Sequence, residues 1–331
     1  MKAVTIHDFG GPETLVLREV PAPVPAAGQV LIAVGAAGVG LADVLMRSGA
    51  FRGAYGAPSE GFTPGLEVAG TVTALGEGVA SEWRGRRVLA LVRTGGYAEQ
   101  TVAAVGSLIP LPDDVAEIDA VALGVNAMVA AIGLDRAGVR PGERVLVRGA
   151  AGGIGVLATQ LAAGRGAVVV ATTSSEERGR QLTRLGASEV VDRAGTGLDP
   201  VDVILDTVAG PDVVAFTGKL RPNGRMVIVG AAGGFPSPEL GAGLLAGFQR
   251  SLTLATLSLD SVDQATLTTA LHGVFDLVRA GRVKPVIAAT LPLGEAATAH
   301  ARLESGQVVG KIVLVPARGL SARRRAATTR G

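Results

Sequence analysis

Short apolar or alternating runs, separated by glycine and proline, dominate the first 120 residues. Runs of this length and spacing, with turn residues between them, are typical of β-strands in an all-β sheet or barrel. The clearest of them are Lys2–Ile6, Leu15–Val20, Gln29–Val34, Val68–Leu75 and Arg87–Val92. The pattern therefore predicts a barrel-like β unit at the N-terminal end of the chain.

From about residue 121 the pattern changes, and apolar strands alternate with segments long enough for helices. The predicted strands are Arg144–Arg148, Ala167–Ala171, Glu189–Val191, Val203–Asp206, Arg225–Val229 and Ser251–Leu257, with helices over 154–165, 175–185 and 211–220. This alternation is typical of a doubly wound parallel sheet, so the fold class is α/β.

The last part of the chain has mixed character, with a helix over 262–281, a strand at Lys284–Ala289, a helix over 294–304 and a strand at Lys311–Val315. We expect this part to return to the first unit. The predicted organisation is a β unit over 1–120, a nucleotide-binding unit over 121–257, a return to the first unit over 258–316 and a disordered basic tail over 317–331.

The charges of the chain are unevenly placed. The formal net charge is +2, but five arginines and no acid lie in the last sixteen residues, so the rest of the chain is slightly acidic. A short basic tail of this composition is typical of disorder. It leaves open a contact with nucleic acid or an anionic surface, but aromatic residues, which stack on bases, make up only 3% of the chain.

Cysteine is absent, which excludes disulfides, thiol nucleophiles and thiolate metal ligands. The three histidines, His7, His272 and His300, have no spacing typical of metal ligands. The N-terminus has no apolar segment of the kind found in signal peptides, and no apolar run reaches the roughly 18 residues of a membrane span. We therefore expect a cytoplasmic, metal-free protein.

A glycine-rich segment, Gly149–Gly155, follows the strand Arg144–Arg148 and opens the next helix. Glycines in such a turn let the backbone approach a pyrophosphate, and the helix N-terminus offers free N–H groups to the anion. Because the turn lies between a strand and a helix in a repeated series, it predicts a dinucleotide site rather than a merely structural turn. The expected contacts are Ala151, Gly152, Gly153, Ile154 and Gly155.

The choice of dinucleotide depends on the end of the second strand, about 20 residues further on, where NAD sites usually carry an acid. Here hydroxyl residues follow instead, among them Thr173 and Ser174, with Arg178 in the next helix and Arg193 after the third strand. Hydroxyls and guanidinium groups suit a 2′-phosphate. The sequence therefore favours NADP, although Arg178 is equally compatible with an ordinary exposed helix position.

Several motifs in order resemble one known family. They are Gly38–Asp43 leading to Arg47–Gly49, Pro64–Gly70, Gly95–Glu99, Pro141–Glu143 before the glycine-rich turn, Gln160, and Gly310–Leu314. From Met1 to about Pro316 the chain resembles the quinone oxidoreductase (zeta-crystallin-like) branch of the medium-chain dehydrogenase/reductase superfamily. The resemblance implies a GroES-like β-rich catalytic domain with a Rossmann NADP-binding domain inserted into it, and a homodimer or tetramer.

The departures from the wider superfamily bear on the chemistry. Zinc-dependent relatives have a Cys where Gly40 stands and a His where Leu66 stands. Quinone-reducing members often have Asn at Gly40, Tyr at Leu45 and Phe51, and Thr at Asn126. We therefore expect a zinc-free enzyme and a more apolar substrate pocket than is usual in the family.

Without a metal or a thiol, we expect hydride transfer from NADPH, with the protein supplying orientation and polar groups. Asn126 is expected to pair with the nicotinamide carboxamide or a substrate carbonyl, or to act as a cap or turn residue. Asp43 is expected to border the cofactor, or to cap the helix that follows it. These two are the candidate catalytic residues.

The remaining candidates line the site by position or by resemblance. Phe51, Tyr55 and Phe62 belong to a glycine-rich loop that we expect to line the substrate pocket, or to be a mobile surface loop. Gly230 and Ala231 follow the fifth strand and are expected beside the nicotinamide half of the cofactor. Lys311 is expected near the site by resemblance alone.

The leading functional hypothesis is NADPH-dependent reduction of a quinone or an activated alkene such as an enone or enal. The alternative within the same class is an enoyl-thioester reductase of polyketide or fatty-acyl metabolism. An alternative of another class is a non-catalytic NADPH-binding or RNA-binding protein. The expected partners are a small electrophilic acceptor and a second copy of the chain, with no membrane and no nucleic acid.

Overall fold

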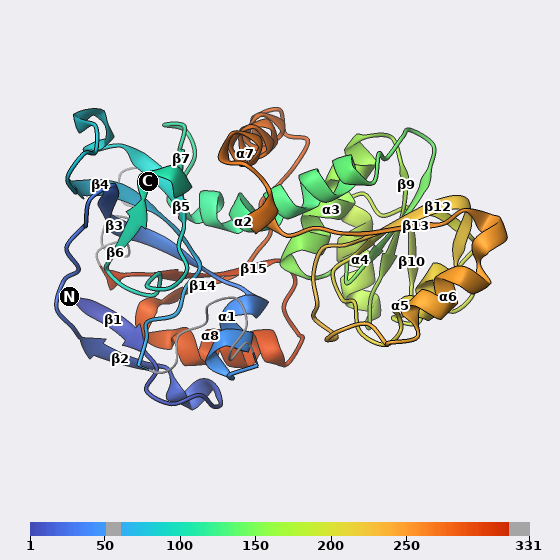
Figure 1. The fold of residues 1–331 in the computed structure, drawn as a ribbon, viewed down its shortest axis with the longest axis horizontal. Coiled ribbons are helices and arrows are strands. Elements are labelled where there is room, and N and C mark those ends of the chain that lie inside the picture. Colours follow the sequence, from blue (N-terminus) through green and yellow to red (C-terminus); the bar gives the residue numbers. More distant parts are fainter. Residues whose placement is uncertain (51–60, 318–331) are drawn as a thin grey trace. The chain divides into compact units, whose positions relative to one another are not determined.

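The computed structural model describes residues 1–50 and 61–317, and they divide into two compact units (Figure 1). Unit 1 is Met1–Gly124 together with Ile287–Gly331, and unit 2 is Val125–Val286. The chain therefore leaves unit 1 once and returns to it once. These crossings fall after Gly124 and Val286, whereas the sequence pattern placed them after residues 120 and 257.

Unit 1 is built mainly from antiparallel strands, as the alternating runs predict. Strands β1 and β2 form a two-stranded sheet, and a seven-stranded sheet has the order β14-β15-β3-β4-β5-β7, with β6 paired to β3. Its strands are β1 (Lys2–Thr5), β2 (Val16–Glu19), β3 (Gln29–Val39), β4 (Glu67–Leu75), β5 (Arg87–Leu91), β6 (Gln100–Ala104), β7 (Leu108–Pro110), β14 (Ile287–Pro292) and β15 (Lys311–Val315). The helices are α1 (Leu41–Arg47) and α8 (Ala296–Glu304).

Unit 2 contains a six-stranded sheet with the order β10-β9-β8-β11-β12-β13, and every neighbouring pair in it is parallel. Its strands are β8 (Arg144–Arg148), β9 (Val168–Thr172), β10 (Glu189–Val191), β11 (Val201–Asp206), β12 (Leu220–Ile228) and β13 (Thr253–Thr256). The helices are α3 (Gly153–Gly164), α4 (Glu176–Arg184), α5 (Val213–Thr217), α6 (Leu240–Ala246) and α7 (Gln264–Arg279). This is the doubly wound Rossmann sheet that the sequence predicts.

Helix α2 (Glu117–Arg136) connects the two units and is interrupted within its length. Gly124 has non-helical backbone angles, φ 18° and ψ −122°, at the position where unit 1 ends. A Cβ atom at this position would lie 1.9 Å from Glu67 Oε1, so any larger residue here would require that carboxylate to move. The helix is long and apolar enough to span a membrane, but 83% of its most apolar stretch is buried inside the structure, as in a core helix.

The segment after α7 stays with unit 2 because it is hydrogen-bonded to α3. The main chain of Lys284 forms two hydrogen bonds with the amide of Gln160, at 2.8 and 3.1 Å. The Arg282 guanidinium donates to the carbonyl of Gly164. Helix α7 therefore belongs to unit 2, although the sequence pattern assigned it to the returning segment.

Local sequence explains where the helices of unit 2 begin. Ser175 caps α4 by accepting a hydrogen bond from the main-chain N–H of Arg178. Asp263 caps α7 in the same way through the N–H of Thr266, at 2.8 Å. Helix α3 has no side-chain cap, because Gly152 stands at its N-cap position. Its first turn is therefore open to an external acceptor.

Candidate functional site: the glycine-rich turn and a buried polar cluster

The turn between β8 and α3 is shaped by close backbone contacts. Gly149 has φ +76°, and a Cβ there would lie 2.2 Å from Thr207 Oγ1. A Cβ on Gly155 would lie 2.3 Å from the carbonyl oxygen of Gly149. Thr172, at the end of β9, accepts a hydrogen bond from Gly149 N at 3.0 Å. The glycines at both ends of the turn are therefore required sterically.

The start of α3 is suited to bind an anion. Its first main-chain hydrogen bond to the cap runs from Val156 N to Gly152 O, at 3.0 Å. The N–H groups of Gly153, Ile154 and Gly155 precede this bond and lie at the positive end of the helix dipole. A pyrophosphate fits such a site without any further charged side chain.

Asn126, on α2 within unit 2, lies directly beside this helix start. A Cβ on Gly153 would lie 2.4 Å from Asn126 Nδ2, so the amide packs against that glycine. Asn126 is only 8% exposed, and its Nδ2 has no hydrogen-bond partner among the described residues. A buried donor without a partner is costly, so this atom suits an acceptor oxygen of a bound ligand.

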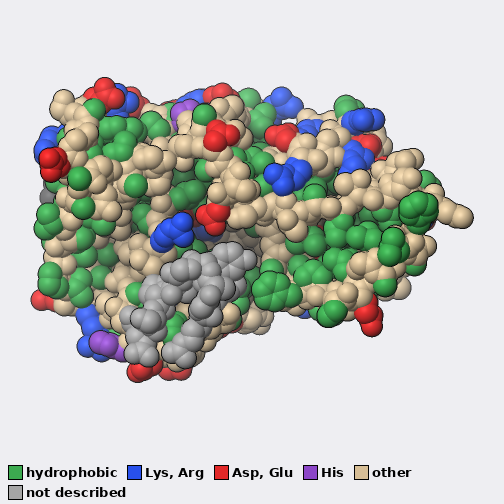
Figure 2. Space-filling view, viewed as in Figure 1, with side chains coloured by type: hydrophobic (Ala, Val, Ile, Leu, Met, Phe, Trp, Pro, Cys, Tyr) green, Lys and Arg blue, Asp and Glu red, His purple; other side chains and the backbone are tan. Residues whose placement is uncertain are grey.

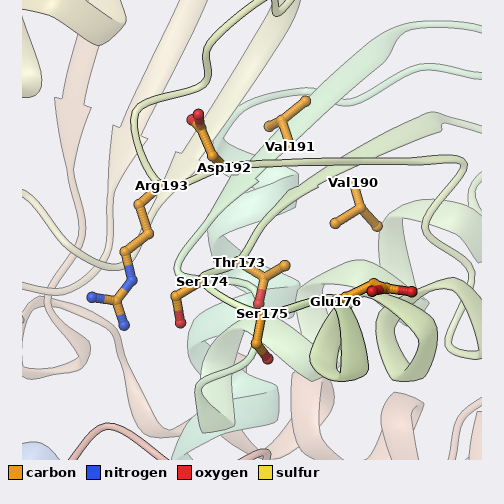
Figure 3. A pocket seen from close by; sticks show the side chains of 8 residues that line it. All are labelled: Thr173, Ser174, Ser175, Glu176, Val190, Val191, Asp192 and Arg193. Atoms are coloured by element: carbon orange, nitrogen blue, oxygen red, sulfur yellow. The ribbon is translucent and has the colours of Figure 1, made fainter.

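A hollow of about 440 Å³ lies at the ends of β9 and β10 (Figure 3). It is lined by Thr173, Ser174, Ser175, Glu176, Val190, Val191, Asp192 and Arg193. In Figure 3 the Arg193 guanidinium and the Ser174 hydroxyl extend to the same side, while the Asp192 carboxylate points away from both. Asp192 accepts a hydrogen bond from Thr196 N at 2.9 Å, which lowers the pKa of its carboxyl and keeps it turned toward its own loop.

Thr172, the last residue of β9, and the three hydroxyl residues that follow it have different roles in the structure. Thr172 supports the glycine-rich turn, and Ser175 caps α4. The Oγ1 of Thr173 is buried and has no partner among the described residues. Ser174 is exposed and accepts a hydrogen bond from Arg178 Nη1 at 3.2 Å. Thr173 and Ser174 are therefore the two hydroxyl residues that neither support the turn nor cap α4, and both line the hollow, with Arg178 hydrogen-bonded to the second of them.

Gly230 and Ala231 follow β12, at the carboxyl edge of the same sheet. A Cβ on Gly230 would lie 2.7 Å from the carbonyl oxygen of Thr207, so the turns after β11 and β12 are in close contact. Ala231 is exposed. The carboxyl ends of β8, β11 and β12 thus meet around Thr207, a residue that the sequence pattern did not single out.

Unit 1 contains a buried cluster of ionisable side chains. Asp43, Glu67 and Lys311 are 2%, 2% and 6% exposed, and Lys311 Nζ lies 2.9 Å from Glu67 Oε2. Asp43 Oδ2 accepts a hydrogen bond from Gly40 N at 2.8 Å, which caps α1. Burial raises the pKa of Asp43 to about 6, and the Gly40 hydrogen bond and the charge of Lys311 oppose that rise.

Tyr97 and His300 complete this cluster. The Tyr97 hydroxyl interacts with the Asp43 carboxyl and lies 3.1 Å from His300 Nε2. Burial, together with the charge of Arg47, lowers the pKa of His300 to about 3, so the imidazole is neutral at ordinary pH. Burial and the charge of Asp43 raise the pKa of Tyr97 well above its usual value.

The expected pocket residue Phe62 lies in a small apolar core of unit 1. Phe62 is 9% exposed and packs with Ile6 and Met46, and its carbonyl accepts a hydrogen bond from Ile6 N at 2.9 Å. The structure therefore places Phe62 in a small core of unit 1 rather than in a substrate pocket, because its ring is covered by that core. Phe51 and Tyr55 lie outside the described residues, as does the basic tail from residue 318.

Among the described residues, no group of three or more His, Cys, Asp or Glu side chains is placed to hold a metal ion. At the two positions where zinc-dependent relatives have ligands, Gly40 carries no side chain and Leu66 packs beside the Ile6–Met46–Phe62 cluster. The buried charged side chains near these positions are Asp43, Glu67 and Lys311, and Lys311 forms an ion pair with Glu67.

A β unit of this kind, together with a parallel sheet that carries a glycine-rich helix start, defines the medium-chain dehydrogenase/reductase class. Two sequence families match the chain: the alcohol dehydrogenase GroES-like domain over residues 26–113 and the zinc-binding dehydrogenase family over residues 185–314. The quinone oxidoreductase of Rattus norvegicus is 33% identical over 95% of this chain and 98% of its own length.

Solved structures agree with these matches. A mycobacterial protein solved in complex with NADPH has a TM-score of 0.87 and 30% identity, covering 96% of this chain and 100% of its own. A quinone oxidoreductase of Pseudomonas syringae has a TM-score of 0.86 and 30% identity, covering 95% and 99% of the two chains. The chain belongs to the zinc-independent quinone oxidoreductase branch of the medium-chain dehydrogenase/reductase superfamily.

Proposed function

We propose that this protein is an NADPH-dependent, zinc-free oxidoreductase that reduces a quinone or an activated alkene. The observation that carries the proposal is the start of α3, where Asn126 Nδ2, which has no hydrogen-bond partner among the described residues, lies beside the N–H groups of the first helical turn. The relatives named quinone oxidoreductase and the NADPH complex of a structural neighbour support it.

The residues of unit 2 support NADPH rather than NADH. A 2′-phosphate carries charge that a guanidinium and hydroxyl groups can neutralise and hydrogen-bond. Arg193, Thr173 and Ser174 line the hollow at the end of β9, and Arg178 is hydrogen-bonded to Ser174. The strand itself ends in Thr172, so no carboxylate stands where an NAD site usually has one.

When bound, NADPH supplies the hydride, and the chain supplies binding, orientation and a place for the proton. The N–H groups of Gly153, Ile154 and Gly155 would hold the pyrophosphate. Asn126 Nδ2 would donate to an acceptor oxygen beside the helix start, which fixes the orientation of the bound group. Gly230 and Ala231 would lie along the nicotinamide half, as they follow the neighbouring strand end.

Asp43 is the candidate acid of unit 1. Reduction of a quinone or an enone places negative charge on an oxygen, which takes up a proton to complete the reaction. Asp43 has a pKa of about 6, so this carboxyl keeps its proton at neutral pH far more often than a solvent-exposed aspartate does. Lys311 would tune this carboxyl through its positive charge, while its own ion pair with Glu67 fixes its position.

The test of the proposal is NADPH oxidation with a panel of 1,4-quinones, enones and enoyl thioesters. Turnover of quinones or enones is the expected result. Turnover of enoyl thioesters alone would instead select the reductase of polyketide or fatty-acyl metabolism. If the protein binds NADPH but turns over no compound of the panel, the result would favour a non-catalytic NADPH-binding protein. The cytoplasmic location expected from the sequence belongs to the same proposal.

We further propose that the protein is a homodimer formed through unit 2. Strand β13 ends the six-stranded sheet, and its outer edge has no paired strand among the described residues. Three large apolar side chains in the segment that precedes this strand, Phe235, Leu245 and Phe248, are 72–79% exposed, and Figure 2 shows hydrophobic side chains gathered in the part of the view where Figure 1 draws α6. Two copies related by a two-fold axis would cover these patches with each other.

Light scattering after size-exclusion chromatography tests the dimer. The native chain should elute at twice the chain mass, and a Leu245→Ser, Phe248→Ser variant should shift toward the monomer. The proposal would be overturned if light scattering found only monomer when the native protein is about 100 times more concentrated than in the NADPH oxidation assay.

A further inference from the structure

A buried arginine, Arg148, lies at the point in the parallel sheet of unit 2 where the order of strand addition reverses. The chain runs from β8 outward to β9 and β10, and then resumes on the other side of β8 with β11, β12 and β13. The switch point is therefore between β8 and β11, and ligands of such sheets bind in the crevice outside the carboxyl ends of these two strands. Arg148 and Asp206 are the last residues of the two strands and are register partners.

The two side chains form a buried ion pair at this position. Arg148 Nη1 lies 3.0 Å from Asp206 Oδ2, and the residues are 4% and 0% exposed. The same Nη1 donates to the carbonyl of Ala209 at 2.6 Å. The Arg148 guanidinium also stacks on the ring of Phe216, with its carbon 4.2 Å from the ring centroid. Its Nη2 also lies 3.4 Å from Oδ2 of the exposed Asp212, so one guanidinium contacts two carboxylates, a carbonyl and an aromatic face.

These contacts fix an unusual turn after β11. Ala209 has φ +52° and Gly210 has φ +77°, and a non-glycine residue keeps such an angle only when its surroundings hold it there. Asp206 Oδ1 accepts hydrogen bonds from the N–H groups of Val208 and Ala209, at 2.8 and 3.0 Å. Arg148 adds two further hydrogen bonds to this turn, one to the Asp206 carboxylate and one to the carbonyl of Ala209.

The turn is also connected to the rest of the proposed nucleotide site. Thr207 lies against Gly149 on one side and Gly230 on the other, at the close distances given above. Val208 O accepts a hydrogen bond from Gly233 N at 2.6 Å, and Gly210 N donates to Gly234 O at 2.9 Å. The position of residues 206–210 therefore sets the spacing between the glycine-rich turn and the loop after β12.

We propose that Arg148 is a positioning residue for dinucleotide binding: through Asp206 and Ala209 it fixes the width of the crevice that the cofactor crosses between its adenosine and nicotinamide halves. This inference rests on the proposed function. Stability alone does not require an arginine here, because replacement of a buried ion pair by apolar side chains is often neutral or stabilising. Lysine cannot reproduce the planar contacts, because its single ammonium does not bridge the carboxylate and the carbonyl while stacking on a ring.

The test compares two ligands that use different lengths of the site. Adenosine 2′-monophosphate occupies only the hollow at the ends of β9 and β10, whereas NADPH also crosses the switch point. In the full-length protein, Arg148→Met should weaken NADPH binding about tenfold or more while the affinity for adenosine 2′-monophosphate stays within about twofold, both measured by calorimetry. Arg148→Lys should give the same pattern to a smaller extent, and it serves if the methionine variant does not fold.

Arg225→Met is the matched control. Arg225, in β12, forms an ion pair with Glu143 at 2.7 Å and donates to the carbonyls of Ala137 and Gly138, near the amino ends of β8 and β13. This variant should lower the melting temperature and leave both affinities unchanged. Equal weakening of both ligands in the Arg148 variants, or of neither, would overturn the inference. Failure of the native protein to bind NADPH would instead overturn the proposed function.

Discussion

The hydroxyl of Tyr97 lies 3.1 Å from Nε2 of His300, and both side chains are fully buried in unit 1. Tyr97 also faces the carboxyl of Asp43, so it stands between an acid and a base. Burial shifts the two outer groups in opposite directions, raising the pKa of Asp43 to about 6 and lowering that of His300 to about 3. As the pH falls, the protein should therefore lose stability through His300. As the pH rises, it should lose stability through Asp43.

The first prediction concerns His300. Its folded pKa is below the unfolded value of 6.5, so its contribution to stability is present above about pH 6.5 and is lost as the pH falls toward 3. Between about pH 7 and about pH 4.5 this loss should amount to about 2–3 kcal/mol. His300→Gln, which places an amide beside Tyr97 in place of the imidazole and is not protonated in this range, should lose less stability. Urea denaturation at several pH values measures the difference.

His7→Gln is the control for this prediction, because His7 is exposed. The free energy of unfolding of the His7→Gln variant should equal that of the native protein at every pH. If His300→Gln shows the same acid-side loss as the native chain, the imidazole is not what limits stability in acid.

The second prediction concerns Asp43. Its folded pKa is above the unfolded value of 3.8, so its contribution is fully present below about pH 4 and is lost as the pH rises through about 6. Asp43→Asn resembles the protonated form and should gain stability relative to the native protein by about 2–3 kcal/mol between about pH 4 and about pH 7. The difference between the two denaturation curves, taken at each pH, removes the contribution of other groups.

The same variant tests the role of Asp43 as an acid. Quinone turnover by the native protein should fall as the pH rises through the pKa of this carboxyl, and Asp43→Asn should turn over slowly without that pH dependence. Asp8→Asn, which removes an exposed carboxyl, should behave as the native protein. A pH profile unchanged in Asp43→Asn would show that the proton comes from elsewhere.

The third prediction separates backbone strain from close contact in the glycine-rich turn. Gly149 and Gly142 both have positive φ, at +76° and +81°, but only at Gly149 would a Cβ meet a neighbour, Thr207. Gly142→Ala should cost about 1 kcal/mol of stability and keep NADPH binding. Gly149→Ala should cost more and should abolish binding, because Thr207 or the turn must move. Fluorescence titration with NADPH measures this difference.

The fourth prediction concerns the preference between cofactors. Arg193→Ala together with Ser174→Asp removes a positive charge and adds a negative one in the hollow at the end of β9. This change should weaken NADPH binding by about tenfold to a hundredfold and favour NADH. Arg180→Ala removes an exposed arginine that is paired with Glu176 and Glu177, and it should leave the preference unchanged. A double variant that still prefers NADPH would move the 2′-phosphate site away from this hollow.

The sequence predicts most of the strands because each is an apolar run between turn residues. β8, β10 and β15 have the expected bounds, and β9 is displaced by one residue. Helix α2 was not predicted, because it is buried on nearly all sides and therefore shows no helical alternation of apolar and polar residues. The second crossing between the units was misplaced because the hydrogen bonds of Gln160 with Lys284 join residues far apart in the chain.

The candidate site was predictable where its chemistry is local. The glycine-rich turn and the hydroxyls after β9 are contiguous motifs, and the structure brings Arg193 to the same hollow as Ser174. The pair of Arg148 and Asp206 was not predictable, because a contact across 58 residues depends on the register of two parallel strands. Phe62 has an apolar side chain in a glycine-rich segment, and only the backbone pairing with Ile6 shows that it is a core residue.

The order in which the chain leaves and re-enters unit 1 has a consequence for its synthesis on the ribosome. Unit 2 is one continuous stretch, so it can fold as soon as Val286 has emerged. In unit 1, strand β15 pairs with β3, and Ile312 is aligned with Val39. The seven-stranded sheet therefore cannot be completed until residue 315 has been translated, and its early strands remain with an unpaired edge until then. In truncated chains that end before residue 311, we expect chaperones to bind mainly the incomplete sheet of unit 1.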